Sequence, residues 1–252
     1  MKLLLEICAP SLRSAIAASR GGADRIELCS ALEMGGLTPG AATLEMAVMQ
    51  SSIPVAVLIR PRGGDFIYNE TEKDLILKEI EFARSTGASG VVVGALQPDG
   101  SLDLGFARAM KQAAGTMEIC FHRAFDQSRK PEQVLDELIA LEYTRILTSG
   151  QQATAWEGRT MIKKLVQRAK GRINLMAGSG IQPDLIGPLM AETGVEQIHY
   201  SAKQTMLPPT GFRSKLSFSA PEMPPNSYWE TDQVLVQKAR QAINLLMSKD
   251  ES

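Results

Sequence analysis

Two short apolar stretches of the chain each carry a glutamate and a cysteine two residues apart. Glu6 and Cys8 lie in LEIC, and Glu27 and Cys29 lie in IELC. Side chains two residues apart on a strand point the same way, so each glutamate shares a face with its cysteine. Two thiolates suit Cu(I), a soft ion, better than Zn(II), which takes more protein ligands. The pattern allows a copper site at Cys8 and Cys29; the alternative is two buried thiols that pack as small hydrophobes.

Further polar side chains follow other apolar runs of the sequence. The candidate catalytic residues are Glu6, Glu27, Arg60, His122 and Asp126. Histidine is a natural general acid or base near neutral pH, which makes His122 the centre of this set. The candidate anion-binding residues are Arg62, Ser149, Gly150, Gly178, Ser179 and Gly180. Arginine binds anions with forked hydrogen bonds, and glycine-rich turns offer backbone N–H groups to phosphate, although tight-turn geometry alone also explains such glycines.

The two glutamates lie in stretches that otherwise look buried. A buried carboxylate costs several kcal/mol, about 3–5, unless it is paired or hydrogen-bonded. We therefore expect Arg60, Arg62 or Arg123 to pair with Glu6 and Glu27. A purely structural layer of ion pairs is the alternative to a catalytic role.

The composition is that of an ordinary soluble globular chain. Its 252 residues are 44% hydrophobic and 22% charged, and the formal net charge of -1 offers no field to recruit nucleic acid or an anionic membrane. No leader pattern or long apolar run is present, which predicts a cytoplasmic protein without membrane association. Three cysteines are too few for a disulfide framework, so reduced thiols are expected.

One pattern recurs eight times along the chain: a short Val/Ile/Leu-rich run, a polar loop and an amphipathic helical stretch. The expected strands are 2–8, 25–29, 55–60, 90–93, 118–122, 145–147, 174–177 and 197–200. The expected helices are 11–20, 41–50, 70–86, 105–114, 131–141, 158–170, 184–192 and 232–247. Eight such cycles predict a single-domain (β/α)8 TIM-type barrel over residues 1–252. A doubly wound open sheet is the alternative, but no GxGxxG follows the first strand.

A long connection follows the expected eighth strand. Residues 201–231 contain five prolines and little periodicity, which is unusual inside a compact domain. We expect a lid or arm across the catalytic face, or an arm that packs on a neighbouring subunit or on the barrel's own helices.

A barrel brings the candidate residues together, because functional groups lie at the carboxyl ends of its strands. Adjacent strands are about 4.8 Å apart, so Cys8 and Cys29 come within reach of one ion if their heights match. Barrel shear can offset those heights by several ångströms. The glycines after the sixth and seventh strands fall where many barrels bind phosphate.

Several ordered blocks of the sequence closely resemble the CutC family of copper-homeostasis proteins. They are GGADRIELCSALEMGGLTP (21–39), IRPRGGDF (59–66), FHRAFD (121–126), RILTSGQ (145–151), LMAGSGI (175–181) and IHYSAK (198–203). The resemblance covers most of the chain up to about residue 205. Gly40 and Ser179 depart from it, since the family's Ser and Gly are expected there.

The resemblance implies a TIM-type barrel, a cytoplasmic location, self-association as a dimer or tetramer, and a Cu(I) site at Cys8 and Cys29. The sequence thus favours a copper-homeostasis protein that binds Cu(I). The alternative is a TIM-barrel enzyme that acts on a small anionic or phosphorylated metabolite, because two cysteines do not explain the other polar residues. A third hypothesis, a non-catalytic scaffold, predicts that ion pairs close the barrel mouth.

Overall fold

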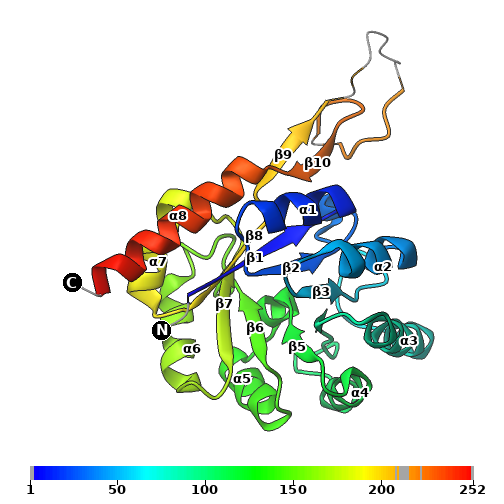
Figure 1. Cartoon of the computed structure of the whole chain (residues 1–252). Helices are drawn as coiled ribbons and strands as arrows, with labels where there is room; N and C mark the ends of the chain where they lie inside the picture. Colours follow the sequence, from blue (N-terminus) through cyan, green and yellow to red (C-terminus); the bar gives the residue numbers. More distant parts are fainter. Residues whose placement is uncertain (1–2, 208, 210–215, 222, 251–252) are drawn as a thin grey trace.

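Eight parallel strands close into a barrel in the order in which they occur in the chain (Figure 1). The computed structural model describes residues 3–207, 209, 216–221 and 223–250. The strands are β1 (Leu4–Ala9), β2 (Arg25–Leu28), β3 (Val55–Leu58), β4 (Gly90–Val93), β5 (Glu118–Phe121), β6 (Arg145–Thr148), β7 (Asn174–Gly178) and β8 (Gln197–Tyr200). Strand β8 pairs with β1, which confirms the predicted (β/α)8 barrel and excludes the open sheet. Lys2, the expected start of the first strand, lies outside the described residues.

Helices cover the outside of the barrel. They are α1 (Leu12–Arg20), α2 (Ala41–Gln50), α3 (Glu70–Thr86), α4 (Leu104–Ala114), α5 (Pro131–Ala140), α6 (Arg159–Ala169), α7 (Pro183–Thr193) and α8 (Gln233–Asp250), with short 3₁₀ turns η1 (Leu32–Met34) and η2 (Arg123–Gln127). Asn69 caps α3 in a reciprocal capping box with Glu72, and Ser11 caps α1. Among the described helices, none is both long and apolar enough to span a bilayer.

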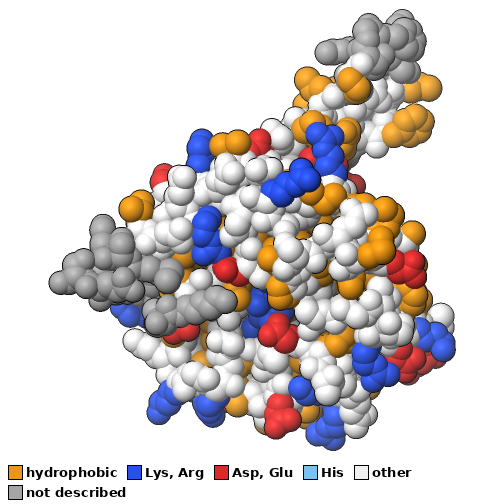
Figure 2. Space-filling model, in the orientation of Figure 1, with side chains coloured by type: hydrophobic (Ala, Val, Ile, Leu, Met, Phe, Trp, Pro, Cys, Tyr) orange, Lys and Arg blue, Asp and Glu red, His pale blue; other side chains and the backbone are white. Residues whose placement is uncertain are grey.

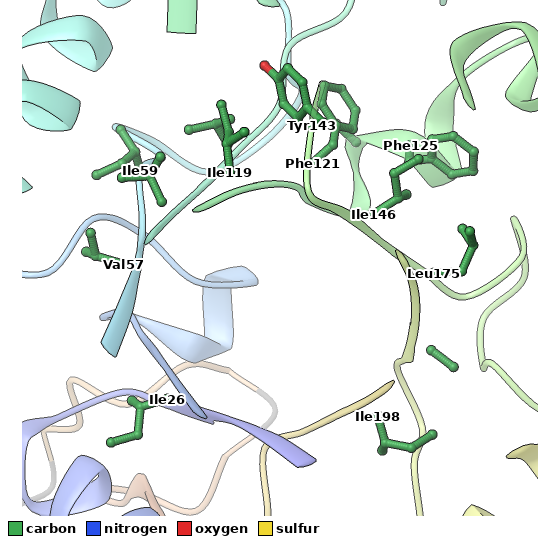
Figure 3. Close-up of a cluster of buried hydrophobic side chains, with 14 of the residues drawn as sticks. Ile26, Val57, Ile59, Ile119, Phe121, Phe125, Tyr143, Ile146, Leu175 and Ile198 are labelled. Atoms are coloured by element: carbon green, nitrogen blue, oxygen red, sulfur yellow. The ribbon is translucent and has the colours of Figure 1, made fainter. Parts of the chain in front are cut away.

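Alternation along the strands separates two kinds of buried side chain. Ile26, Val57, Ile119, Ile146 and Ile198 belong to the large apolar cluster between strands and helices, drawn around the ring of strands in Figure 3. The barrel interior is smaller and holds all three cysteines, grouped with Ala56, Leu58, Val92, Leu147 and Met176. Because neighbours in a strand face opposite ways, the polar residues of the strands share the interior with these side chains.

The segment after β8 is an arm. Its described part contains two antiparallel strands, β9 (Lys203–Met206) and β10 (Tyr228–Thr231), which extend away from the barrel beside α1 (Figure 1). At its base the Ser14 hydroxyl accepts a hydrogen bond from the Thr231 backbone N–H at 2.9 Å and donates one to the Glu230 carboxylate. The described residues form no lid over the mouth, and the expectation of little regular structure was wrong at both ends of the segment.

Candidate functional site

The thiols of Cys8 and Cys29 meet inside the barrel. Their sulfur atoms are 3.5 Å apart, both residues are buried, and neither forms a disulfide. The strand register pairs Cys8 with Glu27, so the two cysteines are offset by two residues along neighbouring strands. The predicted shear is therefore present, and the side chains still bring the sulfurs into contact.

A carboxylate and an imidazole complete this group. The Cys8 thiol lies 3.7 Å from Glu27 Oε1, and His199 Nδ1 lies 4.0 Å from Glu27 Oε2. One donor atom from each of Cys8, Glu27 and His199 falls within 4.8 Å of the others, close enough to share an ion. We refer to Cys8, Cys29, Glu27 and His199 as the thiol cluster.

Glu6 lies beside the thiol cluster in a layer of buried charges. It is fully buried and pairs with Arg25, while Arg145 Nε lies 4.0 Å away and His199 Nδ1 lies 2.8 Å away. Arg25 also donates to Gln197 at 3.1 Å. The buried glutamate has the partners that its burial demands, but they are not the arginines expected from the sequence.

Those expected arginines serve other purposes. Arg60 donates to the backbone carbonyls of Met34, Gly36 and Gly64 at 2.9–3.0 Å, which ties the η1 loop to the loop after β3. Arg62 pairs with Glu72 and Asp65 outside the mouth. Arg123 pairs with Asp126 at 2.9 Å. The prediction that one of the three would neutralise Glu6 or Glu27 was wrong, because the acceptors of all three arginines lie in the loops and helices that follow the strands.

Burial and neighbouring charges shift the ionisation of these groups in opposite directions. Burial alone would raise the pKa of Glu6, but Arg25, the hydrogen bond from His199 and Arg145 hold it well below its usual value. Burial alone would lower the pKa of His199, but Glu27, Cys8 and Glu6 raise it well above 6.5. The contact with Cys29, together with burial, raises the pKa of the Cys8 thiol well above its usual value. Without a metal, Cys8 is therefore a protonated thiol.

A cavity of about 680 Å³ opens at the mouth above these charges. Its walls include Cys8, Glu27 and His199 on one side and Arg60 and His122 on another. The buried ion pairs do not close it, which contradicts the scaffold hypothesis in its stated form. The space is far larger than a metal ion needs and is typical of a small-molecule site.

His122 faces this cavity as a buried, neutral imidazole. Its Nδ1 accepts a hydrogen bond from the Ala124 backbone N–H at 3.1 Å, and its Nε2 has no partner among the described atoms. Burial, with the nearby charge of Arg60, lowers the pKa of His122 to about 3. The proton must therefore sit on Nε2, so this imidazole can donate a hydrogen bond to a ligand but does not carry an exchangeable positive charge at neutral pH.

Asp126 holds the loop after β6 in place. Its carboxylate accepts hydrogen bonds from the backbone N–H groups of Ser149 and Gln151 and from the hydroxyls of Thr148 and Ser149. The Gly150 N–H donates to Thr148 Oγ1 at 2.9 Å. Ser149 and Gly150 thus have their donors occupied within the protein, and neither lines the cavity. The structure separates them from the other candidate anion ligands.

The glycine-rich turn after β7 does reach the cavity. Ser179 and Gly180 line it, whereas Gly178 packs against Leu147 and His199 without lining it. Ser179 adopts φ +82°, a conformation that favours glycine, which gives a physical reason for the glycine expected there from the family resemblance. Its hydroxyl donates to the Ala153 carbonyl at 2.8 Å and so compensates part of the strain.

Three residues that the sequence interpretation did not select belong to this site. They are Arg25 and Arg145, which neutralise Glu6, and His199, which joins the thiol cluster. The alternation of side chains along a strand could have identified Arg25, since it lies two residues before Glu27 and therefore faces the inside of the barrel with it. Arg25 and Arg145 each begin a strand, at the end of the barrel opposite the carboxyl ends of the strands. The sequence analysis looked for functional residues only at the carboxyl ends.

The donor set fits a soft or borderline metal ion. Two thiols in contact, with an imidazole and a carboxylate within reach, offer the ligands that Cu(I) and Zn(II) take in proteins. Fold and site together define a class: a TIM-type barrel with a candidate metal centre and a larger cavity at the carboxyl ends of its strands.

Comparison with known proteins gives this class a family. The CutC family model matches residues 3–204. A CutC family protein from Glaesserella parasuis is 47% identical over 199 residues, covering 79% of this chain and 82% of its own length. A second, from Pasteurella multocida, is 37% identical over 95% of this chain and 98% of its own length. The chain therefore belongs to the CutC family of copper-homeostasis proteins.

A solved structure supports the same conclusion. The crystal structure of CutC from Streptococcus agalactiae, described as a candidate copper homeostasis protein, is 32% identical and superposes with a TM-score of 0.76. It covers 79% of this chain and 98% of its own.

Proposed function

We propose that this protein binds Cu(I) in the cytoplasm through Cys8 and Cys29 and serves copper homeostasis. The observation that carries the proposal is the 3.5 Å contact between the two buried sulfurs. Cu(I) prefers thiolate ligands, and a bound ion replaces the thiol protons. A reducing compartment suits this chemistry because it keeps such a thiol pair from oxidising to a disulfide.

Titration of Cu(I) against a competing chelator under anaerobic conditions tests the proposal. The wild-type protein is expected to hold one ion tightly, and Cys8→Ser and Cys29→Ser are each expected to lose that site. Cys120→Ser is the matched control, because Cys120 is buried in the same interior group but lies outside the thiol cluster. Wild-type affinity in either of the first two variants would remove the two-cysteine site.

A second candidate function, an enzyme acting on a small anionic or phosphorylated metabolite, is favoured by Arg60. This guanidinium is buried, lines the cavity and forms no ion pair with a carboxylate of the described chain. Its Nε also lacks a hydrogen-bond partner among the described atoms. A buried cation without a counter-charge is costly, and a bound anion would supply that charge.

Thermal shift with a panel of phosphorylated metabolites tests this second candidate. A ligand that stabilises the wild-type protein is expected to lose its effect in Arg60→Ala and to keep it in Arg84→Ala, a surface arginine variant. A shift that persists in Arg60→Ala would count against the anion site, and so would a panel without any stabilising ligand.

We also propose that the protein forms a homo-oligomer through its arm. Leu207, Phe218 and Tyr228 are exposed there, and Figure 2 shows hydrophobic side chains gathered on this projection. Phe218 is 94% exposed, an unusual state for a phenylalanine on a monomer surface. Light scattering during size-exclusion chromatography is expected to give a dimer or tetramer that Phe218→Ser weakens; a wild-type monomer would refute this.

A further inference from the structure

His199 occupies an unusual position between the buried charges and the thiol cluster. Its strand, β8, lies beside β1, and the register places it directly across from Glu6. Its Nδ1 is 2.8 Å from Glu6 Oε1, and one of its ring nitrogens shares the 4.8 Å group with Cys8 and Glu27. The same imidazole thus contacts a carboxylate and reaches the atoms that would hold a metal.

This arrangement is the one that metal-binding histidines adopt in proteins. Such a histidine donates its non-ligating N–H to a carboxylate, which fixes the orientation and tautomer of the ring and leaves the other nitrogen for the ion. Glu6 suits that role because it is fully buried and is itself anchored by Arg25. With Nδ1 held by Glu6, a metal would have to take the other ring nitrogen, Nε2.

The two thiols alone give an ion only two ligands. Among the described side chains, Glu27 and His199 are grouped with Cys8 as donors within reach of one ion, and His199 is the nitrogen donor of the two. Soft and borderline ions take imidazole nitrogen together with thiolate sulfur.

We propose that His199 is a third ligand of the metal centre formed by Cys8 and Cys29, and that Glu6 positions its imidazole. The inference rests on the proposed metal-binding function and adds a nitrogen donor to it. Its consequence is a mixed sulfur and nitrogen site, which holds a soft ion such as Cu(I) and also accepts a borderline divalent ion. Glu27, whose Oε2 has no hydrogen-bond partner among the described atoms, is the nearest oxygen donor for a divalent ion.

Chelator competition with Cu(I) tests the third ligand in His199→Gln. We expect the Cu(I) affinity to fall by at least the factor of about 10–100 that removal of an outer-shell partner of a metal ligand costs. Gln182→Ala is the matched control, because Gln182 lines the same cavity but lies outside the thiol cluster, and the Cu(I) affinity of this variant is expected to equal that of the wild type. X-ray absorption of the Cu(I) protein should show a nitrogen scatterer that disappears in His199→Gln.

The positioning role of Glu6 has its own readout. Long-range ¹H–¹⁵N spectra of the Cu(I) protein are expected to show Nδ1 of His199 protonated and Nε2 bound to the metal. If Glu6 does not position the ring, Nδ1 of His199 is not expected to keep its proton when Cu(I) binds. A His199 spectrum that Cu(I) does not change would overturn the proposal.

The outcomes separate this inference from the proposed function. Equal Cu(I) affinity and an unchanged absorption spectrum in His199→Gln would remove the third ligand while leaving the two-cysteine site intact. A wild-type protein without a tight Cu(I) site would remove the copper function, and Co(II) then tests the donor set independently. We expect Co(II) to give thiolate charge-transfer absorption that changes in His199→Gln and not in Gln182→Ala; the absence of this difference would overturn the inference.

Discussion

The two histidines of the chain occupy comparable places and have opposite chemistry. His122 follows β5 and His199 lies on β8, and both line the same cavity at the mouth of the barrel. His122 packs 4.7 Å from the ring of Phe66 and lies near the positive charge of Arg60, so it stays neutral. His199 lies among the carboxylates of Glu6 and Glu27, which raise its pKa, so its imidazole is positively charged at neutral pH.

The comparison shows that side chains on neighbouring strands decide the protonation state of a histidine at the mouth of the barrel. Residue type and position in the strand do not decide it. Around His122, burial and the positive charge of Arg60 disfavour the imidazolium. Around His199, buried anions favour it and also point it toward two thiols. One wall of the cavity therefore presents a neutral imidazole, and the other presents an imidazole held among carboxylates beside a thiol.

The largest expected effect is the difference between the two histidine pKa values. Burial and Arg60 lower the pKa of His122 to about 3, and the nearby anions raise the pKa of His199 well above 6.5. NMR titration of the metal-free protein is therefore expected to show one imidazole neutral and the other protonated at pH 6. Two histidines that both titrate near pH 6.5 would show that their surroundings do not separate the two pKa values.

Removing the carboxylate beside His199 should cost the most stability. Glu6→Leu leaves Arg25 and Arg145 buried without their main counter-charge, and we expect the free energy of unfolding to fall by about 3–5 kcal/mol. Urea denaturation at pH 7 measures it. The control is Glu132→Gln, whose carboxylate pairs with the exposed Lys164 on the surface and is expected to contribute far less. Equal losses in both variants would show that burial of the charges adds nothing.

His122 should make the free energy of unfolding depend on pH under acidic conditions. The folded-state pKa of about 3 lies below the unfolded value near 6.5, so the unfolded chain takes up the proton first. The stabilisation is complete above pH 6.5 and is lost as the pH falls toward 3. Between pH 6.5 and 5 the free energy of unfolding is expected to fall by up to about 2 kcal/mol, at about 1.4 kcal/mol per pH unit.

His122→Asn isolates that contribution, because asparagine can still accept the hydrogen bond of the Ala124 N–H at the start of η2. Urea denaturation at pH 6.5 and pH 5 is expected to show a smaller loss of stability in the variant than in the wild type. Identical pH dependence in the two proteins would mean that His122 is already protonated when folded.

The smallest expected effect concerns the ring that shields His122. Phe66→Leu removes part of the aromatic surface 4.7 Å from the imidazole and is expected to cost about 1 kcal/mol of stability. Water then reaches the ring more easily, so the pKa of His122 should rise from about 3 toward its ordinary value while that of His199 stays high. NMR titration measures both, and an unchanged His122 would assign its low pKa to Arg60 instead.

Local pattern was sufficient to predict the barrel. Short Val/Ile/Leu-rich runs marked the strands, and the helices expected from residues 70 and 131 begin at Glu70 and Pro131 in the structure. Alternation of side chains along a strand correctly placed Glu6 and Cys8 on one face of β1. These predictions succeeded because they depend on residues close together in the chain, where backbone geometry alone sets the direction of each side chain.

Prediction of the ion pairs failed where register mattered. The sequence suggested Arg60, Arg62 and Arg123 because they stand at the carboxyl ends of strands in the same barrel, whereas the pairing of β1 with β2 sets Glu6 opposite Arg25. Closure of the eight strands imposes that offset, and no short stretch of sequence encodes it. The two strands of the expected arm escaped prediction for a related reason, since β9 and β10 are separated by a long connection and pair only in the folded chain.

The sequence by itself determined that two glutamates and two cysteines face the inside of one barrel. Only the tertiary structure decided how they are used: Glu6 turned toward Arg25 and His199, and Glu27 set beside the touching thiols of Cys8 and Cys29. The physical reason is that alternation along a strand is a local property of the backbone, whereas the pKa of a buried group and the geometry of a metal site depend on distances between strands, which closure of the barrel sets.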